Sequence, residues 1–297
     1  MLLIRLFALW PFWVLYLWAD FIGWLAFSVI GYRKAVVIDN LKKSFPEKSD
    51  KEIKKIARRF YRNLGDIIVE SLKVVGLSER QLQKRVSYKD YHILEERLKS
   101  GTSVIVMTPH SGNWEWLLLA CSYLLVKSGF GVDAVYSPLS NQFFDRLMIK
   151  IRSKFGADPT PMNMVLRNVI KSKKDGSKPR VVAMVADQRP LPNESNYWTE
   201  FLHQETAFFI GSERIARKVK FPVVYTSIRR VKRGYYEVSF QALADPPYDK
   251  PASAEDMPII ERFAHLVEQD IKACPDQWLW SHKRWKHKHP QKSTLEN

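Results

Sequence analysis

The first thirty residues constrain the fold most, because almost all of them are apolar. The segment from Leu6 to Ala19 carries no charge, Asp20 interrupts it, and the apolar character resumes from Phe21 to Ile30. A membrane-spanning helix needs about 20 predominantly apolar residues, so this stretch is long enough to cross a bilayer, although Asp20 is costly at mid-bilayer. We predict a membrane-anchoring helix over residues 1–31, which either spans the bilayer or lies in its interface.

Aromatic and basic residues around this segment support the same prediction. Tryptophans are frequent in it, and tryptophan favours the headgroup region of a bilayer. Basic residues follow at Arg33, Lys34, Lys42 and Lys43, so the positive-inside rule places the body of the protein on the cytoplasmic side. A cleaved signal peptide has a shorter apolar core and an A-x-A-like site, and neither is evident. The remaining alternative is a buried core helix.

The charge balance points to an anionic partner. Lysine and arginine number 47 against 31 acidic residues, which gives a net charge of +16. The two partner classes that fit are nucleic acid and the anionic leaflet of a membrane. Cys121 and Cys274 have no paired spacing, so we interpret both as small buried side chains in a reducing compartment and predict no structural zinc site.

Residues 32–297 are expected to form one α/β domain. A capping-box pattern at Ser49–Glu52 opens a helix that keeps helical spacing to Gly76. Further along, short β-branched runs alternate with one-faced helical segments, which is typical of a mixed, mostly parallel sheet flanked by helices. The expected strands are 102–107, 132–136, 181–186, 222–231 and 235–243, the last two forming an antiparallel hairpin. The expected helices are 114–129, 144–155, 163–174, 211–219 and 259–274.

The segment HSGNWE at 110–115 joins the first of these strands to its helix. Pro109 discourages continuation of the strand, Gly112 permits unusual backbone angles, and Asn113 is a good N-cap. A carboxylate on one imidazole nitrogen fixes the tautomer and raises the basicity of the other, as a general base requires. We therefore predict a catalytic pair of His110 and Glu115 at the carboxyl edge of the sheet, where open α/β folds place their sites. The alternative is a histidine that only caps the strand end.

HSGNWE resembles the H-x4-D/E motif of the glycerolipid-type acyltransferases, and its context resembles the late acyltransferases of lipid A biosynthesis, the lauroyl and myristoyl transferases. The likeness covers most of the chain, and the order and spacing of its segments are specific although each alone is weak. Besides HSGNWE and the apolar N-terminus, they are NLKKSFPE at 40–47, a helix containing Glu70, VYSPLSN at 135–141, Arg152 before Gly156, ADQRP at 186–190, TAFFIGSERIA at 206–216 and PDQWLWSHKRWK at 275–286.

The resemblance implies an acyl thioester donor, on acyl carrier protein or coenzyme A, and a hydroxyl acceptor on a lipid A precursor. It implies that His110 deprotonates the hydroxyl, that Glu115 orients His110, and that amides near Gly112 stabilise the oxyanion. It implies an enzyme of the inner membrane that needs no metal and no cofactor. The substrate-binding residues that it implies are Asn113, Arg152, Arg146, Asp187 and Gln188.

Two of these assignments have simpler alternatives, and two positions depart from the family pattern. Arg146 also fits a solvated helix face, and Asp187 also fits a helix or turn cap. Ser137 stands where many members have arginine, and the segment 201–203 reads FLH where many have FFG. Both departures touch regions expected to contact substrate, so they bear on acceptor identity and acyl length.

Three other functions remain as alternatives. An acyltransferase for another membrane lipid (phospholipid, glycolipid or aminolipid) uses the same residues. A serine hydrolase is disfavoured, because Ser111 lacks a G-x-S-x-G elbow. A nucleic-acid-binding protein fits the tail, where Trp278, Trp280 and Trp285 alternate with basic residues, but the same mixture suits an anionic membrane. The apolar N-terminus favours the membrane, and His282, His287 and His289 lack the partners of a metal site.

Overall fold

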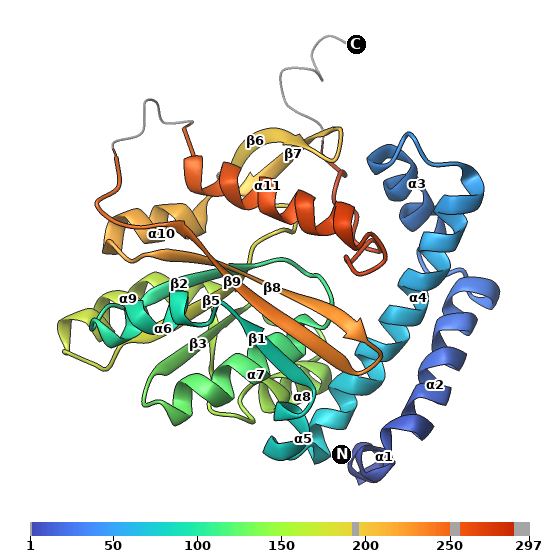
Figure 1. Ribbon diagram of the computed structural model, residues 1–297, viewed down its shortest axis with the longest axis horizontal. Coiled ribbons are helices and arrows are strands. Elements are labelled where there is room, and N and C mark those ends of the chain that lie inside the picture. The colour runs from blue at the N-terminus through green and yellow to red at the C-terminus, as the bar shows by residue number, and fades with distance from the viewer. Residues whose placement is uncertain (1, 192–195, 250–255, 288–297) are drawn as a thin grey trace.

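The computed structural model describes residues 2–191, 196–249 and 256–287 (Figure 1). At its centre is a seven-stranded sheet with the order β1-β9-β8-β2-β5-β3-β4, in which every neighbouring pair is parallel except β8 and β9. This confirms the predicted mixed, mostly parallel sheet and its late hairpin. The strands are β1 (Val86–Lys89), β2 (Val104–Thr108), β3 (Gly131–Tyr136), β4 (Asp158–Pro161), β5 (Arg180–Val185), β8 (Val223–Lys232) and β9 (Tyr235–Ala244).

Helices cover both faces of this sheet, because successive side chains of a buried strand point to opposite sides. In β2, Ile105 and Met107 pack into a core shared with α10 and α11, whereas Val104 and Val106 pack with α7. The helices are α1 (Leu2–Leu9), α2 (Phe12–Trp24), α3 (Lys34–Ser44), α4 (Asp50–Lys73), α5 (Glu79–Gln83), α6 (His92–Lys99), α7 (Trp114–Lys127), α8 (Gln142–Arg152), α9 (Val165–Lys174), α10 (Gly211–Val219) and α11 (Pro258–Ala273).

The strands and helices expected between residues 102 and 274 are confirmed to within a few residues. The capping box is also confirmed: the Ser49 hydroxyl accepts from the backbone N–H of Glu52, whose carboxylate accepts from the backbone N–H of Ser49. The prediction omitted the short elements α3, α5, α6, β1 and β4, and the separate hairpin of β6 (Asn196–Phe201) and β7 (Gln204–Phe209).

One departure from the family pattern lies in the turn of that hairpin. Phe201 pairs with Gln204, so Leu202 and His203 form a two-residue turn, and both have positive φ angles of 52° and 62°. Such turns favour residues that tolerate this backbone conformation. The Leu202 side chain is buried and its N–H donates to Glu268 on α11. The segment 201–203 therefore closes a hairpin and packs it against α11.

The N-terminal segment forms two helices, which meet at Pro11, and α2 continues into a π-helical turn at Leu25–Val29. The stretch Phe12–Val29 is long and apolar enough to cross a membrane, and only 17% of it is buried. Such exposure does not fit the alternative of a buried core helix, so α2 is a candidate membrane anchor. The division of the chain into an anchor at 1–31 and a domain at 32–297 stays a prediction.

Helix α2 lies along α4, as the two neighbouring blue ribbons in Figure 1 show. Its buried face consists of Leu15, Ala19 and Gly23, whereas its tryptophans point outward. Small residues allow the two backbones to approach closely: a Cβ atom added to Gly65 of α4 meets the carbonyl oxygen of Ala19 at 2.3 Å. Asp20, the charge expected to be costly, pairs with Arg62 and Arg233.

The sequence predicts that the tryptophans of the tail form an exposed face that stacks on bases or binds headgroups. This prediction is wrong for Trp278 and Trp280. They are 2% and 0% exposed, and the centroids of their rings lie 4.7 Å apart. The apolar surface of the two indoles belongs to the core beside α11 and β7. His289 lies outside the described residues.

We expect the substitution Gly65→Leu to separate α2 from α4. Its side chain collides with the backbone of Ala19, and overpacking of this kind costs about 2 kcal/mol. The measurement is the thermal unfolding midpoint in detergent, with Arg59→Leu on the exposed side of α4 as the matched control. An unchanged midpoint for Gly65→Leu would show that the close approach of the two helices is not required.

Candidate active site

His110 and Asp187 face each other at the carboxyl ends of two neighbouring strands. β2 and β5 are parallel, with Thr108 opposite Val185, so the residue two positions beyond each strand reaches the same edge. The imidazole Nδ1 lies 2.5 Å from one Asp187 oxygen, and the backbone N–H of His110 donates to the other at 2.9 Å. The indole of Trp278 donates to that second oxygen at 2.7 Å. Asp187 is therefore held by three donors in a buried position.

This arrangement suits a general base. Burial disfavours a charge on Asp187, but the imidazole and backbone N–H of His110, with the indole of Trp278, hold the pKa of the carboxyl below its usual value. A carboxylate at Nδ1 fixes the proton on that nitrogen and leaves the lone pair of Nε2 to accept a proton. The amide nitrogen of Gln188 lies 3.2 Å from Nε2 and marks the position from which a substrate hydroxyl reaches it.

Glu115 does not take the place predicted for it beside His110. It lies in the first turn of α7 and binds Arg152 of α8 through two hydrogen bonds of 3.0 and 2.6 Å. Because Asn113 starts the helix, Glu115 is carried toward α8 while His110 stays on the loop. The predicted contact is thus replaced by two pairs, His110 with Asp187 and Glu115 with Arg152. The catalytic roles of His110 and Glu115 stay predictions, as do the substrate-binding roles of Asp187 and Arg152.

Asn113 is built into the turn. It is fully buried; its side-chain oxygen accepts the backbone N–H of Trp116 at 3.1 Å, and its side-chain nitrogen donates to Glu70 at 2.6 Å. This confirms Asn113 as the N-cap and turns its side chain toward α4, whereas its predicted contact with substrate stays untested.

The backbone of Gly112 also fixes the position of the turn at 110–115. It has a φ of +55°, and a Cβ atom added there meets the carbonyl oxygen of Ile228 at 2.3 Å. Its N–H donates to the carbonyl of Gln277 at 2.8 Å, so this amide is not free to stabilise an oxyanion as expected. The first N–H groups of a helix have no partner within it, which leaves the start of α7, at Trp114, as the donor position.

An apolar groove of about 840 Å³ reaches this site. Its walls come from the π-helical turn after α2, from α4 and from α8, with Phe144, Leu147 and Met148 among the lining side chains. Trp114, Glu115 and Gln188 also line it. The groove is within the volume range of ligand pockets and is lined mainly by apolar side chains, which suits a hydrocarbon chain.

Arg146 is the one predicted site residue that lies apart from the others. It is exposed on α8 and donates to Gln142 one turn away at 3.3 Å. This placement corresponds to the alternative of a solvated helix face.

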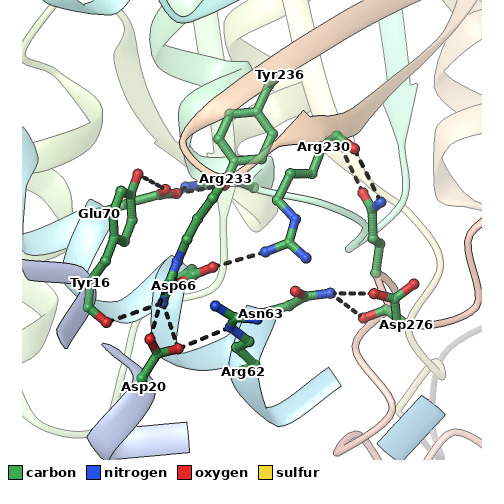
Figure 2. A network of polar contacts seen from close by, with 12 residues as sticks. Tyr16, Asp20, Arg62, Asn63, Asp66, Glu70, Arg230, Arg233, Tyr236 and Asp276 are labelled. Carbon is green, nitrogen blue, oxygen red and sulfur yellow. Dashed lines mark hydrogen bonds and ion pairs between the residues drawn. The ribbon is translucent and has the colours of Figure 1, made fainter. Parts of the chain in front are cut away.

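In the sequence, Glu70 stands out only as part of the family resemblance. In the structure, its side chain contacts Asn113 of the turn at 110–115. Its buried carboxylate accepts hydrogen bonds from Tyr16 at 2.8 Å, Tyr236 at 2.6 Å and Asn113 at 2.6 Å (Figure 2). Burial raises the pKa of Glu70 to about 7, although these hydrogen bonds oppose the shift. A glutamate at a position with helical, inward-facing spacing was the only signal of this role in the sequence.

Comparison with known proteins identifies the family. A family model described as bacterial lipid A biosynthesis acyltransferase matches residues 1–287. The chain belongs to that family. Membership makes it an acyltransferase of lipid A biosynthesis and confirms the resemblance inferred from the motifs.

Named relatives support the same family over most of their length. The chain is 26% identical to lipid A biosynthesis acyltransferase 2 of Shigella flexneri, over 84% of this chain and 75% of the relative. It is 24% identical to the lipid A biosynthesis myristoyltransferase of Escherichia coli K12, over 87% of this chain and 76% of the relative. It is 23% identical to the lauroyltransferase of the same organism, over 93% and 86%.

We expect Asp187→Asn to lower the kcat of acyl transfer by about 10²- to 10⁴-fold, the usual contribution of general acid–base catalysis. The amide loses the negative charge that fixes the Nδ1 proton of His110. The measurement is kcat with purified protein in detergent, beside Glu115→Gln and the surface control Asp39→Asn. A large loss in Glu115→Gln with wild-type kcat in Asp187→Asn would restore the pair predicted from the sequence.

The raised pKa of Glu70 predicts a pH-dependent stability. A folded pKa of about 7 lies above the ordinary 4.5, so the carboxyl contributes stability below about pH 4.5 that is lost as the pH rises through 7. The variant Glu70→Gln does not lose this stability as the pH rises. Between pH 4.5 and 8 we therefore expect its free energy of unfolding to increase relative to that of the wild type by up to about 3 kcal/mol. Thermal unfolding midpoints across this pH range measure the difference, with the exposed Glu96→Gln as the surface control. Parallel curves for wild type and Glu70→Gln would contradict the raised pKa.

Proposed function

We propose that this family member transfers a fatty acyl chain from a carrier thioester to a hydroxyl of a lipid A precursor. The single observation that carries the proposal is the His110–Asp187 pair beside an apolar groove, whose lining includes Gln188, the side chain in contact with Nε2 of His110. A base beside a hydrocarbon-sized groove is what the transfer of an acyl chain to an alcohol requires. The donor is acyl carrier protein or coenzyme A, as the resemblance implies.

The reaction follows from the geometry of the pair. Nε2 of His110 removes the proton of the acceptor hydroxyl, and the hydroxyl oxygen forms a bond to the thioester carbonyl carbon. The tetrahedral oxyanion then collapses, the carbon–sulfur bond breaks, and the imidazolium returns its proton to the departing thiolate. Asp187 stabilises the imidazolium between these steps without accepting its proton, because it is held ionised by its three donors. The products are an ester and a free carrier thiol.

Groups around the pair support the charged intermediate. The N-terminus of α7 points its first N–H groups and its positive dipole end toward the turn that holds His110, which favours an oxyanion there. Glu115 and Arg152 form a neutralised pair at the groove and orient the walls around the reacting carbonyl. Gln188 leaves Nε2 when the acceptor hydroxyl takes its place.

We place the enzyme on the cytoplasmic face of the inner membrane. The exposed side of α2 presents Trp13, Leu17, Phe21 and Trp24, a mixture of apolar and interfacial side chains. The net charge of +16 is complementary to anionic lipids, to acyl carrier protein and to the phosphates of lipid A precursors. A nucleic-acid-binding function loses the support of two tail tryptophans, because Trp278 and Trp280 are buried.

We expect wild-type protein in detergent to acylate a lipid A precursor and His110→Ala to lose this activity, because the variant lacks the imidazole that Asp187 holds. Products are measured by mass after incubation with carrier and coenzyme A thioesters of several chain lengths. The surface variant His265→Ala is the matched control. Equal product from wild type and His110→Ala would remove the base from the mechanism. Acylation of a phospholipid, glycolipid or aminolipid alone would replace the acceptor and keep the chemistry.

A further inference from the structure

Two chains of polar contacts run from the apolar helix α2 to the turn that holds His110. The first is short. Tyr16 of α2 donates to one oxygen of the buried Glu70 at 2.8 Å, and the side-chain amide of Asn113 donates to the other at 2.6 Å. Because the other end of the Asn113 amide caps α7 through Trp116, the orientation of this side chain is fixed from both sides.

The second chain starts one helical turn further along α2, at Asp20. The guanidinium of Arg233, in the turn between β8 and β9, donates to both oxygens of Asp20 at 2.9 and 2.8 Å. The same guanidinium donates to Asp66 of α4 at 2.9 Å through Nε. Figure 2 shows Arg233 reaching between the two carboxylates. Asp66 is 1% exposed, so its charge depends on these partners.

This second chain continues from Asp66 to the catalytic turn. Arg230 donates to the remaining oxygen of Asp66 at 2.8 Å. The backbone N–H of Arg230 donates to the side chain of Gln277 at 2.8 Å. The backbone carbonyl of Gln277 accepts the N–H of Gly112 at 2.8 Å. The two chains therefore end on adjacent residues, Gly112 and Asn113.

From this convergence we propose that α2 is a regulatory part of the active site, and that Glu70 is a positioning residue which couples its seating on α4 to the turn that holds His110. The inference rests on the proposed role of His110 as the base. When α2 is seated, Tyr16 and Asp20 complete the hydrogen bonding of two buried carboxylates. When α2 is displaced, Glu70 loses the hydrogen bond from Tyr16, and Arg233 loses its ion pair with Asp20. Both losses change the contacts that hold the turn at 110–115.

The composition of α2 indicates what controls its seating. One face packs on α4 through small residues, and the opposite face is apolar and exposed. A ligand shifts such an equilibrium when it binds one state better than the other. A lipid bilayer surface is the ligand whose chemistry fits the exposed aromatic face. The enzyme is therefore most active when a membrane holds α2 in the seated position.

Two conservative variants test the coupling, one for each chain. Tyr16→Phe removes only the phenolic hydroxyl that binds Glu70, and Asp20→Asn removes the charge that binds Arg233. Neither side chain touches the groove or His110. Tyr88→Phe is the matched control, because it removes a phenolic hydrogen bond to the carbonyl of Ala120 on α7, outside both chains.

We measure hydrogen–deuterium exchange at the amides of Gly112 and Trp116, together with kcat and KM, in detergent and with vesicles of anionic phospholipid. Both variants are expected to speed exchange at these amides and to lower kcat by about 3- to 10-fold at unchanged KM for the donor, whereas Tyr88→Phe does neither. Vesicles are expected to slow the same exchange in the wild type.

Two outcomes would overturn the coupling. One is exchange at Gly112 and Trp116 that matches the wild type in both variants. The other is faster exchange spread evenly over the chain with a lower unfolding midpoint, which is the signature of a merely structural role. If vesicles leave the exchange rates of the wild type unchanged, the membrane is not the ligand that holds α2 against α4. Because exchange needs no substrate, these results stand even when no acyl transfer to lipid A is found, which separates this inference from the proposed function.

Discussion

The hydrogen bond between His110 and Asp187 depends on the register of two parallel strands, and the rest of the site is arranged around it. Thr108 lies opposite Val185, so the side chains of His110 and Asp187 leave the sheet at the same level. The buried carboxylate is tolerable only because three donors surround it, and one of them, Trp278, comes from the C-terminal end of the described chain. The tryptophan that sequence patterns placed on the surface is thus one of the three donors that keep Asp187 ionised.

The site contains several buried carboxyl groups, and each is bound by partners from a different part of the chain. Asp187 is bound by His110 and a C-terminal indole, Glu115 by Arg152 of α8, and Glu70 by phenols from α2 and β9. Removal of one partner leaves an uncompensated group in a low-dielectric interior. The turn at 110–115 is therefore assembled only when distant segments have packed, which makes its geometry a property of the whole fold.

The sequence was sufficient for the alternation of strands and helices and for the turn at 110–115, because these are local patterns of periodicity, capping and glycine. The sequence was insufficient to predict which side chain pairs with His110. Glu115 is five residues from His110 and was preferred over Asp187, which is 77 residues away. Only the strand order brings β2 beside β5, and no local pattern reports that order. Asp187 carried one usable signal, its position just past a buried strand. Glu70 and Trp278 carried less, because inward-facing helical or aromatic residues usually belong to a core.

The contacts of α2 also bear on how the apolar N-terminus meets a membrane. Its buried face runs along α4, whose exposed positions include Arg58, Arg59 and Arg62, and Arg62 pairs with Asp20. A helix that crossed the bilayer in this arrangement would carry these charges into the hydrocarbon, at a cost of several kcal/mol. A helix that lies in the interface keeps them near water while its tryptophans occupy the headgroup region. The arrangement therefore favours the interfacial form of the predicted anchor.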